Sequence, residues 1–330
     1  MSLADGYRIG VDLGGTRIKA AVFDAHFGVI VERSDPTEAA RGPGEVIRKI
    51  KNIVHEMLLQ NGIEQQEILC MGVGIPGLLD PKTGISIFSP NFPGWEQIPV
   101  VELLKAEFRF PVYIDNDVRV NLYGEWLFGA GRGCTNVMLI TLGTGLGSGI
   151  IQDGRMVYGT TASAGEIGHM NMYREGRPCR CGSSGCLGRY ASAVGMVRTF
   201  TEQLNEGNRS MIQDWTGADQ TQITAEMISQ AYDQGDALAI KVMHETGEIL
   251  GYGLANVVNL LNPQMIIVGG GMSAAGDRLL DTVRKTVDSH ALKLSSSSCQ
   301  ILQAELGVRA GMLGAAAYAK LRSQGLNDRE

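Results

Sequence analysis

Residues 8–23 read RIGVDLGGTRIKAAVF, and residues 136–151 read NVMLITLGTGLGSGII. In both stretches a short apolar run is followed by a glycine turn and a second apolar run, a pattern that predicts two strands joined by a tight turn. A shift of 129 residues, the separation of Asp12 and Thr141, superposes the first turn on the second. This repeat predicts two domains of related topology that face each other across a cleft, each with a turn rich in backbone N–H groups.

The rest of the chain alternates between predicted helices and strands. Residues 44–60 carry apolar side chains at three- and four-residue spacing, which predicts an amphipathic helix. Residues 68–73 and 111–115 are short apolar strands that run into loops, where open α/β sheets place their ligands. A helix is predicted over residues 308–321, and we expect it to pack back on the first domain. The fold class is therefore α/β.

Composition and charge exclude several classes of protein. With 44% hydrophobic and 19% charged residues, the chain has too much apolar material for disorder. A net charge of −6 and the lack of a basic face argue against a nucleic-acid partner. Apolar runs stay well short of the ~18 residues of a membrane span, and the N-terminus lacks the features of a signal peptide. We therefore expect a cytoplasmic protein without a membrane partner.

The two glycine turns are candidate phosphate-binding loops. Small residues let the backbone approach an anion, and a carboxylate at a strand end can hold a hydrated Mg²⁺. An ordinary hairpin is the alternative for a single turn of this kind, but the repetition favours phosphate binding. Neither turn fits the phosphate-loop pattern or opens a helix as a dinucleotide fingerprint does. The candidate residues are Asp12, Gly14, Gly15, Thr16, Gly143, Thr144 and Gly145.

Asp115-Asn116-Asp117 follows a predicted strand, so its side chains point in alternating directions and the last ones can reach a cleft. One carboxylate there could accept a proton. A helix cap, with Asn116 or Asp117 leading into residues 118–128, is the alternative, and the residues alone favour it.

Three of the six cysteines crowd into residues 179–186. With His169 upstream they supply three thiolates and one imidazole, the ligand set of a closed tetrahedral zinc site. Reduced surface thiols are the alternative, which the local density of cysteine disfavours. A histidine with one nitrogen on zinc can offer the other ring N–H to a substrate. The proposed ligands are His169, Cys179, Cys181 and Cys186, and the remaining cysteines are interpreted as buried small apolar residues: Cys70, Cys134 and Cys299.

Taken in order, these motifs resemble those of the ROK family (repressor, open reading frame, kinase), over essentially the whole chain. The cysteine block with Glu-x-Gly-His before it is highly specific to that family. The chain is most similar to its bacterial sugar kinases of the glucokinase type. The segments that carry the resemblance are Asp12-Leu-Gly-Gly-Thr16, Gly74-Ile-Pro-Gly77, Asn91-Phe-Pro-Gly94-Trp95, Asn116-Asp117, Leu142-Gly-Thr-Gly145, Glu166-Ile-Gly-His169, Cys179-x-Cys181-Gly182-x2-Gly185-Cys186 and Gly269-Gly-Gly271.

The resemblance implies an actin-like ATPase (ribonuclease H-like) fold, in which two α/β domains close on sugar and ATP. The expected smaller domain spans residues 1–128 plus the C-terminal helix at about 306–330, and the larger domain, with the zinc loop, spans residues 129–305. We also expect a homo-oligomer, a dimer or a tetramer.

The resemblance further implies ATP-dependent phosphorylation of a hexose hydroxyl, at C6 of glucose, in carbohydrate metabolism and glycolysis. Asp117 corresponds to the base for the sugar hydroxyl, and Asp12 lies near Mg²⁺ and the phosphates. The glycine turns cradle phosphate, Gly270 and Gly271 lie near the nucleoside, and the zinc is structural. The residues that match sugar ligands are Asn91, Asn116, Asp117, Glu166 and His169.

Two positions depart from the family pattern. Gly188 stands where a glutamate usually reaches the reducing-end hydroxyls of the sugar, which leaves another hexose or an N-acetylhexosamine as alternative substrates. Arg119 stands where many members have asparagine. A non-catalytic, sugar-responsive regulator is the alternative function, because the family includes repressors. Those carry an N-terminal DNA-binding extension, whereas the phosphate turn here begins at Asp12, so we expect a kinase.

Overall fold

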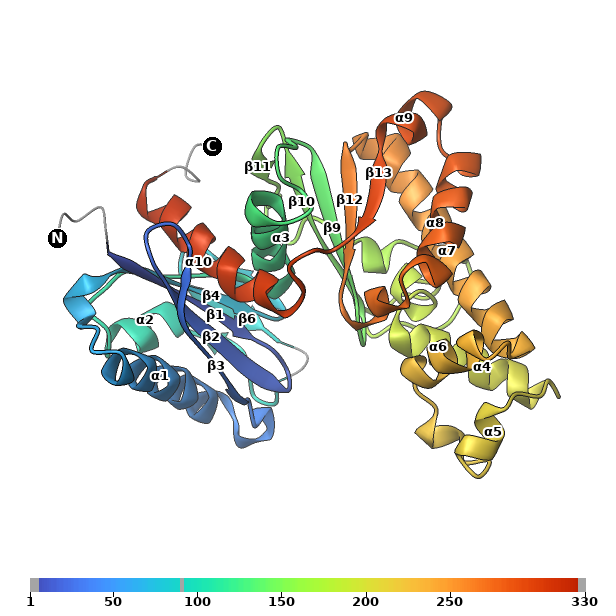
Figure 1. The fold of residues 1–330 in the computed structure, drawn as a ribbon, viewed down its shortest axis with the longest axis horizontal. Coiled ribbons are helices and arrows are strands. Elements are labelled where there is room, and N and C mark those ends of the chain that lie inside the picture. Colours follow the sequence, from blue (N-terminus) through green and yellow to red (C-terminus); the bar gives the residue numbers. More distant parts are fainter. Residues whose placement is uncertain (1–5, 90–91, 326–330) are drawn as a thin grey trace. The chain divides into compact units, whose positions relative to one another are not determined.

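The computed structural model of the chain describes residues 6–89 and 92–325. It divides into two compact units, whose elements are labelled in Figure 1. Residues 129–133 and 155–164, expected in the larger domain, belong to the first unit. Among the described residues, none of the helices has the length and apolar character needed to span a bilayer. The first unit comprises Met1–Gly133, Arg155–Ala164 and Glu305–Glu330, and the second comprises Cys134–Gly154 and Gly165–Ala304.

The first unit is built on a five-stranded sheet in the order β3-β2-β1-β4-β8. Neighbouring strands run antiparallel from β3 to β1 and parallel from β1 to β8. The register pairs Asp12 with Gly74 and Gly74 with Asp115, so the carboxyl ends of β1, β4 and β8 lie at one edge. The strands are β1 (Tyr7–Leu13), β2 (Arg17–Phe23), β3 (Val29–Pro36), β4 (Ile68–Ile75) and β8 (Val112–Asn116).

Helices cover both faces of this sheet (Figure 1). Helix α1 (Pro43–Gln60) buries the apolar stripe predicted from its spacing, including Val46, Ile50 and Val54. Helix α10 (Ala310–Ser323) packs on β1, β4 and α3, so the predicted return of the chain to the first domain is confirmed. The other elements are α2 (Val100–Lys105), α3 (Asp117–Phe128), a small sheet of β5 (Leu78–Asp80), β6 (Ile85–Phe88) and β7 (Glu96–Ile98), and the short β11 (Arg155–Met156).

Helix α10 lies directly on the strands because glycine faces it. A Cβ added at Gly10 of β1 would lie 1.8 Å from the carbonyl oxygen of Met312, and one at Gly72 of β4 would lie 1.9 Å from that of Ala315. Only glycine allows backbones to approach this closely. The side chains on the buried face of α10 are correspondingly small, and Ala315 and Ala316 are fully buried.

The second unit has its own sheet, in which β10, β9, β12 and β13 follow in this order. An antiparallel pair beside a parallel strand thus occurs twice, as β2-β1-β4 and as β10-β9-β12, which is the topology behind the sequence repeat. The elements are β9 (Val137–Leu142), β10 (Leu146–Gln152), β12 (Met265–Gly269), β13 (Gln300–Gln303), α4 (Ala193–Asn205), α5 (Ile212–Trp215), α6 (Ala225–Asp233), α7 (Ala237–Leu261), α8 (Asp277–His290) and α9 (Lys293–Ser298).

Helix α7 packs in the second unit's core, and polar residues at both ends fix its limits. Asp236 caps its first turn by accepting a hydrogen bond from the backbone N–H of Ala239 at 2.8 Å. Asn262 ends it in the left-handed conformation, with φ of 46°, and Pro263 cannot continue it. Between these caps, thirteen residues are buried against neighbouring elements such as α8, to which the helix packs closely.

Candidate functional site

In the first unit, the candidate residues gather at the carboxyl edge of the sheet. Asp12 lies at the end of β1, and Asn116 and Asp117 join β8 to α3. Asn116 caps α3: its Oδ1 accepts from the N–H groups of Val118 and Arg119 at 2.9 and 3.3 Å. Its Nδ2 donates to the carbonyl of Gly77 at 3.1 Å. The helix-cap alternative therefore describes Asn116, while Asp117 occupies the first helical turn.

The carboxylates of Asp12 and Asp117 influence each other. Desolvation raises the pKa of Asp117 to about 7, and the negative charge of Asp12 contributes to that rise. Burial also raises the pKa of Asp12, against the opposing charge of Lys19, its cross-strand neighbour. Ionising both carboxylates at once costs free energy, which a bound cation or a proton taken up by one of them would relieve.

Three glycines of the two turns face open space, whereas a Cβ at Gly14 would lie 2.9 Å from the carbonyl oxygen of Arg17. A Cβ added at Gly15, Gly143 or Gly145 would meet no atom within 4 Å among the residues that the structure describes, apart from its chain neighbours. None of the three has a positive φ. The fold itself therefore does not require glycine there. The missing side chains leave the backbone of the turns accessible to a ligand.

The late glycine segment lies beside the turn of the second unit. Gly270 has φ of 82°, and a Cβ there would lie 2.5 Å from the carbonyl oxygen of Leu142, the residue before the β9–β10 turn. Gly271 begins a short 3-10 helix, η7 (Gly271–Ala275), and a Cβ there would meet nothing within 4 Å among the described residues. The structure thus brings the predicted phosphate turn Gly143–Gly145 and the predicted nucleoside segment together.

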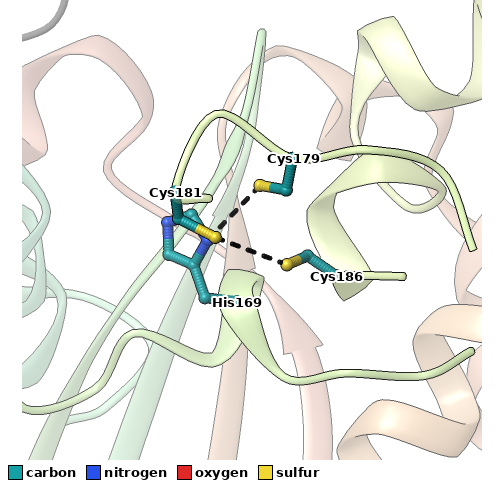
Figure 2. A group of neighbouring side chains, drawn as sticks. All are labelled: His169, Cys179, Cys181 and Cys186. Carbon is teal, nitrogen blue, oxygen red and sulfur yellow. Dashed lines mark hydrogen bonds between the residues drawn. The ribbon is translucent and has the colours of Figure 1, made fainter. Parts of the chain in front are cut away.

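His169, Cys179, Cys181 and Cys186 converge as predicted, and Figure 2 shows the four side chains around one point. Their ligand atoms all lie within 4.8 Å of one another. The Sγ of Cys179 is 3.7 Å from Nδ1 of His169, and the Sγ atoms of Cys181 and Cys186 are 3.7 Å apart. A tetrahedral zinc, with Zn–S bonds of about 2.3 Å and a Zn–N bond of about 2.0 Å, has edges of roughly 3.5–3.8 Å. The residues therefore fit the ion.

The cysteine loop is folded tightly by its glycines. Gly182 and Gly185 both have positive φ, and a Cβ at Gly185 would lie 1.8 Å from the carbonyl oxygen of Tyr173. Burial raises the pKa of Cys186, so its thiolate needs a positive partner. The other cysteines correct one expectation: Cys70 is buried, but Cys134 and Cys299 are partly exposed, because they lie just before strands rather than within them.

The remaining predicted sugar ligands lie in different parts of the chain. Glu166 precedes the short 3-10 helix η4 (Ile167–His169), His169 is its last residue, and both side chains are exposed. Because Nδ1 of His169 faces Cys179, its Nε2 is on the other edge of the ring. Gly188 lies in η5 (Leu187–Arg189), which packs on η4. Asn91 lies outside the described residues.

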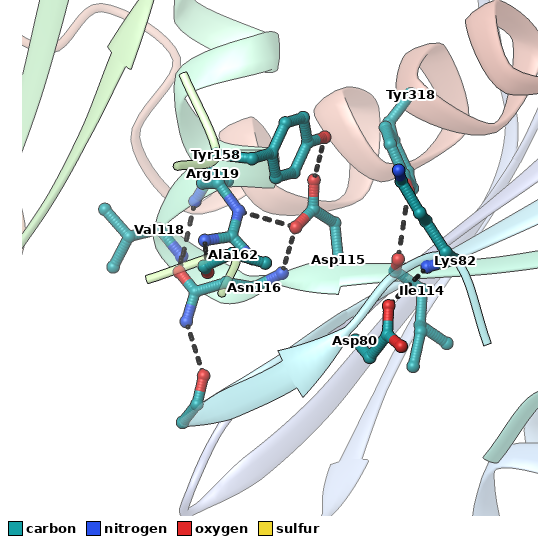
Figure 3. A network of polar contacts seen from close by, with 11 residues as sticks. Asp80, Lys82, Ile114, Asp115, Asn116, Val118, Arg119, Tyr158, Ala162 and Tyr318 are labelled. Atoms are coloured by element: carbon teal, nitrogen blue, oxygen red, sulfur yellow. Dashed lines mark hydrogen bonds and ion pairs between the residues drawn. The ribbon is translucent and has the colours of Figure 1, made fainter. Parts of the chain in front are cut away.

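Sequence reasoning missed two buried polar groups on α3. Arg119 pairs with Asp115 and contacts Tyr158 and Ala162, as Figure 3 shows. Glu125, 1% exposed, accepts three backbone hydrogen bonds. The signal for the first was an aspartate at the end of a predicted strand followed four residues later by an arginine at the start of the predicted helix. A single buried glutamate gives no comparable signal in a sequence.

The sequence of the chain is similar to those of a known protein family. A sequence profile described as the ROK family matches residues 8–322. The chain is 36% identical to a glucokinase of Halalkalibacterium halodurans, over 94% of each chain. It is 28% identical to a xylose repressor of Caldicellulosiruptor bescii, covering 94% of this chain and 77% of the repressor.

Among solved structures, the fold is similar to that of a ROK family glucokinase from Streptomyces griseus in complex with glucose and AMPPNP. The TM-score is 0.80 at 32% identity, covering 96% of this chain and 99% of the other. A ROK hexokinase from Thermus thermophilus matches with a TM-score of 0.78 at 27% identity, covering 96% and 99%. The predicted fold class is confirmed by this likeness.

Proposed function

The chain belongs to the ROK family, and from that premise we propose that it transfers the terminal phosphoryl group of ATP to a hydroxyl of a hexose, C6 of glucose in the first instance. Support comes from glucokinase relatives at 36% and 31% identity over most of the chain. It also comes from the likeness to a glucokinase that holds glucose and AMPPNP.

One observation carries this proposal more than the others: the shared carboxyl edge of β1 and β8, which places Asp12 and Asp117 in electrostatic contact. A fold needs no such pair, because each carboxylate raises the energy of the other when both are ionised. A carboxylate pair next to a glycine turn suits phosphoryl transfer, because that chemistry consists mainly of positioning and charge stabilisation.

Asp117 is the proposed general base. A pKa raised to about 7 makes its carboxylate a stronger proton acceptor than an ordinary aspartate, yet leaves much of it ionised near neutral pH. It would accept the proton of the sugar hydroxyl as the bond to phosphorus forms. Its place in the first turn of α3, capped by Asn116, fixes the backbone from which it reaches.

ATP and Mg²⁺ are the proposed cofactors of the reaction. The turns at Gly14, Gly15 and Thr16 and at Gly143, Thr144 and Gly145 would receive phosphate oxygens, and Gly270 and Gly271 would border the nucleoside. Asp12 supplies the hard oxygen ligand that Mg²⁺ prefers. Burial raises the pKa of its carboxyl group although Lys19 opposes the rise, so a bound cation would stabilise the carboxylate. When bound, the metal neutralises charge on the phosphates.

Zinc is proposed as a structural cofactor, held by His169, Cys179, Cys181 and Cys186. A site with four protein ligands has no open position for chemistry. Its effect on function would pass through His169, whose Nδ1 faces the site and whose Nε2 is then free to donate to a sugar hydroxyl. The sugar ligands proposed in each unit are Asn91, Asn116 and Asp117 in the first and Glu166 and His169 in the second.

A coupled assay of ADP release tests the proposal. The panel is glucose, mannose, fructose, N-acetylglucosamine and N-acetylmannosamine, each with ATP and Mg²⁺. We expect turnover with glucose or a close relative, reduced by ~10²-fold or more in the Asp117→Asn variant. An absence of ADP release with every sugar, in protein that still binds one of them by calorimetry, would favour the sugar-responsive regulator suggested by the xylose repressor relative.

The proposed enzyme is also expected to be a homo-oligomer, a dimer or a tetramer. Light scattering coupled to gel filtration measures this directly. A mass equal to the 35.4 kDa of one chain would contradict it.

A further inference from the structure

A buried polar network joins the start of α3 to residues 155–164. The side chains of Asp115 and Arg119 are 0% and 6% exposed, and Nε of Arg119 donates to Oδ1 of Asp115 at 2.6 Å. The hydroxyl of Tyr158 donates to Oδ2 of the same carboxylate at 2.7 Å, and the guanidinium of Arg119 lies 5.1 Å from the centre of its ring. The carboxylate is thus satisfied on both oxygens (Figure 3).

The same guanidinium makes a second bond that the ion pair does not need. Its Nη1 donates to the carbonyl of Ala162 at 2.8 Å. Ala162 has φ of 54°, a left-handed conformation that is unfavourable for a residue with a Cβ. The N–H of Ala164 donates to the carbonyl of Tyr158 at 3.0 Å and closes the loop. A strained residue therefore sits at the point where Arg119 holds the loop.

This loop leads directly into Glu166. The carbonyl of Gly165, the residue before it, accepts a hydrogen bond from the hydroxyl of Ser148, within the second unit. The chain entering Glu166 is thus held at Ala162 and again at Gly165. Only three residues separate Ala162 from Glu166, so the turn at Ala162 sets the backbone from which this short connection starts.

We propose that Arg119 is a positioning residue for sugar binding, which fixes the left-handed turn at Ala162 and thereby the path of the chain into Glu166. This inference rests on the proposed function, because it takes Glu166 as a ligand of the sugar. It assigns Arg119 no contact with sugar, ATP or the transferred group.

Arginine suits this position because of its shape. The planar guanidinium presents donors in fixed directions, so one group can bond Asp115 through Nε and Ala162 through Nη1. The ammonium of lysine keeps the charge beside Asp115 but is a single point at the end of a flexible stem. Arg119→Lys therefore retains the buried ion pair and loses the bond to Ala162.

The test compares Arg119→Lys with Arg284→Lys. Arg284, on α8, also joins a carboxylate to a backbone carbonyl, with bonds of 2.7 Å to Asp277 and 3.1 Å to Ile301, and it is outside the proposed site. For both variants we measure the KM for sugar, the KM for ATP, the sugar affinity by calorimetry, and the hydrogen exchange of a peptide covering residues 158–164.

For Arg119→Lys we expect faster hydrogen exchange in that peptide. The KM and the Kd for sugar should rise about tenfold, because a misplaced binding group costs on the order of 10- to 100-fold. The KM for ATP should change less than twofold. Arg284→Lys should match the wild type. An unchanged sugar KM, or an equal rise for both substrates, overturns the inference. A wild type that binds sugar without transferring phosphate refutes only the proposed function, since calorimetry still tests Arg119. A wild type that binds no sugar refutes both.

Discussion

The carboxylate of Glu125 accepts a hydrogen bond from the backbone N–H of Leu306 at 2.8 Å, across 181 positions of sequence. It also accepts from the N–H groups of Ala130 and Glu305, both at 3.1 Å. Gly129 is needed beside it, because a Cβ there would lie 2.2 Å from the carboxylate oxygen. One buried acid at the end of α3 thus fixes two segments close to the points where the chain passes between its units, near Gly133 and Ala304.

Glu125→Gln should lower the free energy of unfolding by about 1–3 kcal/mol. The carboxylate is only an acceptor here, and an amide nitrogen in its place would point a donor at one of the three N–H groups. Urea denaturation measures the change. Glu305→Gln is the matched control, because the side chain of Glu305 is 53% exposed in a surface pair with Arg132, and it should change stability by less than about 0.5 kcal/mol. Equal stability of Glu125→Gln and wild type would contradict the role of this group.

Asp117→Asn should reduce turnover by ~10²-fold or more while sugar affinity changes much less, because the amide keeps the shape but cannot accept a proton. Steady-state kinetics and calorimetry measure the two effects separately. Asp35→Asn, a surface change on β3, is the control and should leave both unchanged. Near-full turnover in Asp117→Asn would remove Asp117 from the mechanism.

The raised pKa of Asp117 also predicts a pH dependence of stability. Between its ordinary value of 3.8 and about 7, the folded protein keeps the Asp117 proton that the unfolded chain releases. Stability contributed by this group is therefore present at low pH and lost as pH rises through about 7. Asp117→Asn has no such proton to lose. Without Mg²⁺, its free energy of unfolding relative to that of the wild type should therefore increase by on the order of 2 kcal/mol between pH 4.5 and pH 8. Denaturation at several pH values measures this, and a gap that stays flat or narrows would be inconsistent with a raised pKa.

Zinc should be present at close to one ion per chain in protein prepared without chelators. Cys181→Ser should lose the ion and weaken sugar binding, because His169 would no longer be held by it. Cys299→Ser, which alters a cysteine outside the cluster, should keep the metal. Elemental analysis and calorimetry decide this, and wild-type protein without zinc would refute the site.

Gly188→Glu should lower the KM for glucose by roughly tenfold if position 188 faces the sugar, since a charge-assisted hydrogen bond is worth ~1.5–3 kcal/mol. A Cβ at 188 would lie 3.2 Å from the carbonyl oxygen of Gly168, beside His169, so the new side chain starts next to the proposed ligand. Gly188→Ala controls for that contact. Unchanged KM values for every accepted sugar would mean that position 188 does not face the sugar.

The sequence by itself determined the elements and the chemistry that local patterns encode. The hairpins around Gly14 and Gly143, helix α1 and the limits of α7 follow from short-range periodicity and caps, which act over a few residues. The four residues of the cysteine cluster could be named because His169 and Cys186 are only 17 positions apart, and the residue types suit one ion. The family followed from the order of these motifs.

Only the tertiary structure decided how distant groups act on each other. The pKa of Asp117 is raised first by burial and then by the charge of Asp12, which the parallel register of β1, β4 and β8 brings to the same edge. The membership of residues 155–164 in the first unit depends on side chains of α3, and Glu125 finds its partners 180 and 181 positions later. Such interactions depend on burial and on long-range register, which leave no periodic trace in the chain, so a single buried arginine or glutamate cannot be interpreted before its neighbours are known.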